Sequence, residues 1–308
     1  RHRIGGRDFD SAVMGQFGRL FTGITENQHT VALSLVGASG IGKTFSSLCF
    51  PSATSVPNNT KCFTSYIGFN SGLNLTDDER RHLRAAQREK QRENWLEAAA
   101  NAVARVILSR VLASVVLLRK HYDQLEPSAN SSSKPIMKFA HESKLLEVPA
   151  ESLRQLVAHE ITGLVKDVVK RESSITRVAL LVNLDEAQEL DALIKDGSRP
   201  QGARYGMRVL RQLQLAVSKA SVNKCVMLGL ATGINPQLVL ASDTAGKNVP
   251  ITTTLLSRNE FDDLAKQRWP DKQHVGMFAA AAFPRVRDML LRMTVESIAA
   301  EVNSLANT

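Results

Sequence analysis

Apolar residues gather in short runs along this chain, and longer stretches with helical spacing separate them. Three runs, at 30–36, 177–186 and 223–231, are apolar on both faces, as the central strands of a parallel sheet are. The run at 61–70 alternates and carries aromatic residues, and 251–255 is a short further strand candidate. Strands that alternate with helices in this way predict an α/β fold with a mainly parallel sheet.

Between the strands the pattern predicts helices. Thr76 and Glu79 have the spacing of a capping box, in which each side chain satisfies the other residue's backbone amide at the helix start. The helical region that follows is charged as far as Glu97 and then apolar to Leu118. Because Arg110 interrupts the apolar part, and an arginine deep in a bilayer is costly, this part predicts a buried helix and not a membrane span.

The remaining pattern predicts the domain plan. Further helices are expected at 152–170, 204–220, 260–267 and 278–305, and the serine-containing stretch 126–135 is the most loop-like. Residues 1–29 form an N-terminal segment, residues 30–255 a core with a helical insertion at 76–175, and residues 256–308 a small C-terminal helical part.

The segment after the first strand carries the sharpest chemical signal. It reads Gly37-Ala38-Ser39-Gly40-Ile41-Gly42-Lys43-Thr44, which matches the phosphate-binding pattern G-x-x-x-x-G-K-[S/T]. Glycines let backbone amides wrap around a phosphate. The helix predicted directly after the motif, from Phe45 onward, presents the positive end of its dipole to the same anion. Lys43 is placed to neutralise the β- and γ-phosphates, and Thr44 to ligate Mg²⁺. The motif, extended to Phe45, predicts a nucleotide site in a three-layer P-loop NTPase fold.

A second signal ends the apolar run at 177–186. Asp185 is placed to hold Mg²⁺, and the adjacent Glu186 to act as general base on an attacking water. An acidic residue directly after the aspartate favours ATP over GTP, and the guanine-reading motif Asn-Lys-x-Asp is absent, because Cys225 and Val226 follow Asn223-Lys224. The alternative interpretation is a strand that happens to end in an acidic turn.

A third signal ends the apolar run at 223–231. In a sheet of this class, a polar residue at the tip of the strand beside the phosphate-loop strand contacts the γ-phosphate or the water. Thr232 is the first candidate for that role and Asn235 the second. An ordinary turn or capping residue is the alternative.

Composition adds a charge and a compartment to this picture. The 308 residues carry 39 Lys and Arg against 30 Asp and Glu, a formal net charge of +9 that favours acidic partners. Three widely separated cysteines suit a reducing, intracellular compartment and form no disulfide framework. The first residues lack the apolar run of a signal peptide, and no membrane partner is expected.

Two basic clusters account for much of the charge. Arg204, Arg208 and Arg211 are spaced to share one helical face, which is either a solvated surface or the source of an arginine finger in a homo-oligomer or larger assembly. The basic stretch 79–92 is a candidate for contact with a DNA or RNA backbone, although its interleaved glutamates favour a surface helix.

Taken in order, four segments resemble a known family: Gly37–Thr44, Tyr66–Asn70, Leu180–Gln188 and Gly229–Asn235. They resemble the AAA-like, signal-transducing P-loop ATPases of the ASCE class, and most of all the NTPase module of Crinkler and retrotransposon-hot-spot proteins. The resemblance spans residues 30–295. It implies an intracellular protein and is compatible with a nuclear location.

Two shorter elements extend the resemblance. Ala282-Phe283-Pro284-Arg285 is similar to the family's G-x-P-R element, which implies that Arg285 contacts the nucleotide as a sensor, although Ala282 replaces the glycine. Gly6-Arg7-Asp8 is similar to the G-R-[D/E] element that lies near the adenine pocket, and a loose basic terminus is the alternative.

The expected function is Mg²⁺-dependent binding and hydrolysis of ATP. Hydrolysis would drive a conformational switch in a Crinkler-like effector or a nucleic-acid-linked assembly, with ATP and Mg²⁺ as cofactors. Two alternatives remain open, because one fold serves many tasks. One is a scaffold or effector module that binds nucleotide without turnover, and the other is a basic structural subunit with a vestigial loop.

Overall fold

The computed structural model describes most of the chain. The described residues are 6–21, 30–36, 43–50, 56–69, 75–88, 94–120, 133–196, 198–221, 224–233 and 246–252, with Asn259, Asp262 and Lys266. The chain divides into two compact units, the larger comprising Asp10–Val36 and Ser47–Ile251 and the smaller Arg1–Phe9, Gly37–Ser46 and Thr252–Thr308. The sheet and the helices that pack on it belong to the larger unit.

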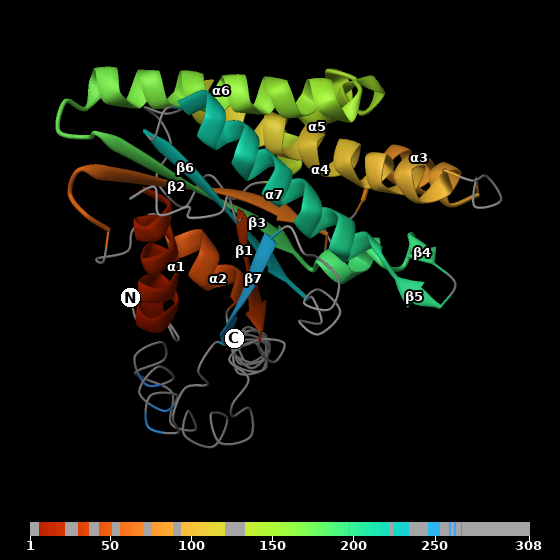
Figure 1. The fold of residues 1–308 in the computed structure, drawn as a ribbon, viewed down its shortest axis with the longest axis horizontal. Coiled ribbons are helices and arrows are strands. Elements are labelled where there is room, and N and C mark those ends of the chain that lie inside the picture. The colour runs from red at the N-terminus through yellow and green to blue at the C-terminus, as the bar shows by residue number, and fades with distance from the viewer. Residues whose placement is uncertain are drawn as a thin grey trace, which may run out of the picture. The chain divides into compact units, whose positions relative to one another are not determined.

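Five strands form one sheet in the order β2-β3-β6-β1-β7 (Figure 1). Their bounds are β1 Thr30–Val36, β2 Thr60–Gly68, β3 Arg177–Asp185, β6 Cys225–Thr232 and β7 Gly246–Thr252. The pairs β2–β3, β3–β6 and β1–β6 are parallel, which confirms the predicted α/β class. The strand that ends before Gly233 lies beside the strand of the glycine motif, as the sequence predicted, and on its other side it pairs with the strand of the acidic pair.

Three long helices cover one face of the sheet. They are α4 (Trp95–Lys120), α6 (Ala150–Arg171) and α7 (Gly202–Ser221), which pack against one another and against the strands (Figure 1). The other elements are α1 (Gly6–Phe21), α2 (Lys43–Cys49), α3 (Asp77–Arg88), α5 (Ser133–Glu142), the 3₁₀ turns η4 (Leu145–Glu147) and η5 (Ala187–Leu190), and the hairpin of β4 (Lys195–Asp196) and β5 (Arg199–Pro200).

Alternation along β3 divides its side chains between two environments. Leu180, Val182 and Leu184 belong to the apolar core beneath the three long helices. Asn183 points to the opposite face, where its Nδ2 donates to Ser47 Oγ of α2 at 2.7 Å. Because successive side chains of a strand alternate, Asp185 shares the face of Asn183. Helices on both faces of a parallel sheet are compatible with a three-layer α/β arrangement.

Helix α4 is a core helix, as its charge pattern predicted. It is the one helix among the described residues that is long and apolar enough to cross a membrane, yet 78 % of its apolar window is buried inside the fold. Arg110 in its middle is buried at 1 % exposure and is paired with a carboxylate. A buried partner explains how an arginine is accommodated in an otherwise apolar stretch.

Most predicted element positions are confirmed to within a few residues. The capping box is present: Glu79 N–H donates to Thr76 Oγ1 at 3.2 Å, and Thr76 N–H donates to a Glu79 carboxylate oxygen at 2.7 Å. Strand β7 begins at Gly246, before the predicted start at residue 251. The helices predicted at 260–267 and 278–305 lie almost wholly outside the described residues.

Three expectations were wrong in detail. Helix α1 occupies a terminus for which no helix was predicted, and its Phe17 stacks on Phe50 with ring centroids 5.8 Å apart. Helix α5 begins at Ser133, inside the stretch read as loop, because a proline in a helix's first turn breaks no hydrogen bond. Arg208 is exposed, whereas Arg211 is buried with an exposed fraction of only 5 %, so the α7 arginines do not form one solvated face.

Candidate functional site at the carboxyl edge of the sheet

The predicted site strands end side by side. Leu35 of β1 is in register with Thr232 of β6, and Leu184 of β3 is in register with Ala231. Because the strands are parallel, their carboxyl ends meet at one edge of the sheet. Polar residues that follow these strands are therefore brought together, and such an edge is where open α/β sheets bind ligands.

Asp185 lies at the centre of this edge and is buried at 1 % exposure. Its Oδ2 accepts a hydrogen bond from the Tyr66 hydroxyl of β2 at 2.7 Å, and its Oδ1 accepts one from the Thr232 hydroxyl of β6. Three adjacent strands thus supply one carboxylate and two hydroxyls that hold it.

Thr232 joins both members of the acidic pair. Its hydroxyl donates a hydrogen bond to the Asp185 carboxylate and accepts one from the backbone N–H of Glu186, with 3.0 Å between the Glu186 nitrogen and Thr232 Oγ1. Glu186 is half-buried and has a left-handed backbone with φ 58°, and its carboxylate accepts a hydrogen bond from the Gln188 amide. The structure therefore brings the predicted residues Asp185, Glu186 and Thr232 into contact, with Tyr66 and Gln188 as partners that the sequence did not predict.

Gly233 gives the turn after β6 the room it needs. Its φ is +72°, and a Cβ built on it would lie 1.5 Å from Gln188 Oε1. We expect Gly233→Ala to lower the free energy of unfolding by about 1 kcal/mol or more, because a side chain is strained at positive φ and must displace Gln188 from Glu186. Urea unfolding measures the change.

Gly15→Ala is the matched control for this substitution. Gly15 is exposed in α1 and a Cβ there meets nothing within 4 Å, so alanine should leave stability unchanged or raise it. An unfolding midpoint of Gly233→Ala equal to that of the wild type would contradict the constraint at Gly233.

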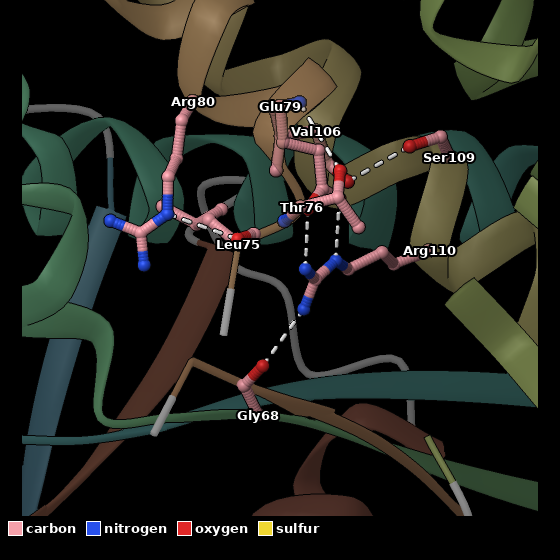
Figure 2. Close-up of polar contacts among 8 residues, drawn as sticks. All are labelled: Gly68, Leu75, Thr76, Glu79, Arg80, Val106, Ser109 and Arg110. Atoms are coloured by element: carbon pink, nitrogen blue, oxygen red, sulfur yellow. Dashed lines mark hydrogen bonds and ion pairs between the residues drawn. The ribbon is translucent and has the colours of Figure 1, made fainter. Parts of the chain in front are cut away.

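A buried ion pair anchors the end of β2 beside the site. Arg110 of α4 donates from Nε and Nη2 to the two carboxylate oxygens of Glu79 at 2.7 and 2.5 Å, and from Nη1 to the Gly68 carbonyl at 2.8 Å (Figure 2). Gly68 is in register with Asp185, and the Phe69 N–H donates to the Asp185 carbonyl at 3.0 Å. The pair therefore fixes the strand end on which Tyr66 reaches Asp185.

Polar side chains also attach α2 to the sheet. Thr64 of β2 donates to the Ser47 carbonyl at 3.1 Å, and Asn183 of β3 donates to the Ser47 hydroxyl at 2.7 Å. The polar Asn183 within an apolar strand is thus explained by its contact with this helix. Lys43 and Thr44 are the first two residues of the same helix and are partly buried.

The other predicted site residues lie outside the described part of the chain. They are Gly37, Ala38, Ser39, Gly40, Ile41, Gly42, Asn235, Arg285 and the side chain of Phe45. Within the described ranges, no group of three or more His, Cys, Asp or Glu is arranged to hold a metal. A metal at this edge would therefore need ligands of other kinds besides Asp185.

The described cysteines contribute no thiol chemistry to the site. Cys225 is fully buried, and burial raises its thiol pKa to about 12. Burial, reinforced by the charge of Asp10, raises the pKa of Cys62 to about 12 as well. Because the thiolate is the reactive form, both are packing residues in the apolar interior.

Comparisons with known proteins add no relative: no family model matches the chain, and no curated protein matches it. The chemistry at the carboxyl edge of the sheet is therefore the basis on which function is argued.

Proposed function

We propose that this chain is an Mg²⁺-dependent ATPase with a P-loop fold, similar to the NTPase module of Crinkler and retrotransposon-hot-spot proteins. One observation carries the proposal. Asp185, Glu186 and Thr232 lie at the same sheet edge at which β1 ends, and the chain leaves β1 directly into the motif Gly37–Thr44. Strand β6 lies between β1 and β3, and this strand order is the one expected of the glutamate-using ASCE class.

The roles follow from the chemistry of each residue. Lys43 and the amides of the glycine motif bind the phosphates, since backbone N–H groups and an ammonium favour an anion at a helix start. Thr44 and Asp185 would hold Mg²⁺, and the donor set fits, because hydroxyl and carboxylate oxygens are its preferred protein ligands. Bound Mg²⁺ neutralises charge on the phosphate oxygens.

Glu186 is the general base and Thr232 orients the acidic pair. The Thr232 hydroxyl fixes the backbone of Glu186 and the carboxylate of Asp185 at once, so their relative geometry is set before nucleotide binds. Tyr66 is a positioning residue, because it acts through Asp185. A proton taken from water by the Glu186 carboxylate would be passed on once phosphate leaves.

A nucleotide-binding scaffold without turnover is the second candidate. The Glu186 carboxylate is bound by the Gln188 amide in this structure, which occupies the group that would act as base. If that contact persists when ATP is bound, nucleotide would be held and not hydrolysed. Nucleic-acid contact remains a proposal, suggested by the net charge of +9. Assembly into oligomers is a further proposal, suggested by the α7 arginines as a source of an arginine finger.

Lys43→Ala tests the proposal at the binding step. We expect wild-type protein to bind ATP in an Mg²⁺-dependent way, and Lys43→Ala to bind it about 10- to 100-fold more weakly, because a charged hydrogen bond to phosphate is lost. Isothermal titration calorimetry measures both affinities. Lys219→Ala, at an exposed position in the last turn of α7, is the control and should bind as wild type does. Equal affinity in Lys43→Ala, or no binding by the wild type, would contradict the proposal.

A further inference from the structure

A polar cavity of about 580 Å³ opens where α4, α6 and α7 meet. Residues of all three helices and Asp196 of β4 line it, whereas Asp185, Glu186 and Thr232 do not. Its volume lies in the range of roughly 300–1,000 Å³ that small-molecule sites occupy. A ligand in this cavity would therefore be separate from the ATP proposed above.

Three arginines converge on the cavity from two helices. Arg204 and Arg208 are one turn apart on α7, and Arg154 faces them from α6. The Nη2 of Arg154 donates to Gln212 at 2.9 Å and its Nη1 to Glu151, while its buried Nε has no acceptor among the described residues. Arg208 is exposed. A planar guanidinium group can donate two hydrogen bonds to the oxygens of one phosphate, so several of them suit a multiply charged phosphate group.

The cavity lining also carries acceptors. Glu97 of α4 and Asp196 of β4 line the cavity, with the amide of Asn101 near Glu97 in the same helix. Tyr205 also lines the cavity, and burial raises its pKa, so its hydroxyl stays protonated as a donor. The charges of Arg204 and Arg208 act on the pKa of that hydroxyl in the opposite direction to the charge of Asp196.

We propose that this cavity binds a small phosphorylated molecule that also carries hydroxyl or amino groups, of the size and chemistry of a nucleoside monophosphate. The arginines take the phosphate, and the carboxylates of Glu97 and Asp196 accept from the hydroxyl or amino donors. A nucleic-acid strand fits less well, because the same two carboxylates would repel a continuous phosphate backbone. The site is independent of the proposed ATPase activity.

Calorimetric titration with AMP tests the proposal on the intact chain. We expect AMP to bind wild type and Lys43→Ala with the same affinity, and to bind the double variant Arg204→Ala/Arg208→Ala about tenfold or more weakly. Inorganic phosphate should compete with AMP, which identifies the phosphate as the recognised group. Arg84→Ala, at an exposed position of α3, is the control and should bind as wild type does.

Several results would overturn the proposal. They are AMP affinity unchanged in the double variant, AMP binding abolished by Lys43→Ala alone, no AMP or phosphate binding by the wild type, and binding of a single-stranded oligonucleotide in preference to AMP. Because Arg208 is exposed, Arg208→Ala alone should keep the wild-type circular dichroism spectrum and melting temperature. It should still weaken AMP binding, which separates loss of a contact from loss of fold.

Discussion

Arg110→Ala is expected to lower the free energy of unfolding by about 3–5 kcal/mol, the largest stability loss of any single side chain considered. Arg110 is buried at 1 % exposure, and its guanidinium supplies bonds to both oxygens of Glu79 and to the Gly68 carbonyl. Truncation leaves the Glu79 carboxylate buried and uncompensated, and removes the cation that lies 5.2 Å over the Phe69 ring. Urea unfolding followed by circular dichroism measures the loss.

A salt bridge on the protein surface is the control that distinguishes the effect of burial from the effect of losing a charge. Arg81 pairs with Asp78 on the same helix as Glu79, but its side chain is 76 % exposed, so Arg81→Ala should cost less than about 1 kcal/mol. Arg110→Met combined with Glu79→Leu should cost less than the sum of the two single changes, because no lone charge stays buried. A loss for Arg110→Ala as small as that for Arg81→Ala would contradict this account.

The strands of this fold are predictable from sequence for a simple physical reason. A strand buried on both faces is apolar at nearly every position, and the apolar runs in the sequence predicted β1, β3 and β6 to within one or two residues of their observed bounds. The order of the strands needed the added information of the motifs. Helix α1 was not predicted, although its buried residues Phe9, Val13 and Phe17 are spaced four apart, which is a helical pattern.

The site shows the same division between local and tertiary information. Asp185, Glu186 and Thr232 were predictable because each sits at a recognisable strand end. Tyr66 was not, because its contact with Asp185 depends on the register that pairs Gly68 with Asp185. With that register known, alternation places Tyr66 on the same face of β2 as Gly68, because the two residues are two positions apart in the strand. The burial of Arg211 likewise depends on packing that spacing alone does not describe.

Glu186→Gln is expected to lower the steady-state rate of ATP hydrolysis by about 10²- to 10⁴-fold, the size of a general-base contribution. Glutamine keeps the shape of the side chain, and the backbone N–H that donates to Thr232 at 3.0 Å is untouched, so the acidic strand end should keep its geometry. An amide has no carboxylate to take a proton from water. Mg²⁺-ATP affinity should therefore stay near the wild-type value while turnover falls, and release of inorganic phosphate measures the turnover.

Glu189→Gln provides the control for this loss of turnover. Glu189 lies in η5, the 3₁₀ turn that directly follows Glu186. It is exposed and loses the same charge on substitution, so the rate of Glu189→Gln should match that of the wild type. Equal residual rates in the wild type and Glu186→Gln would contradict the assignment of the base. If both also bound Mg²⁺-ATP, the function would be that of a nucleotide-held scaffold. The contact between Gln188 and the Glu186 carboxylate would then be the feature that keeps the bound nucleotide intact, because it occupies the carboxylate that would take the proton.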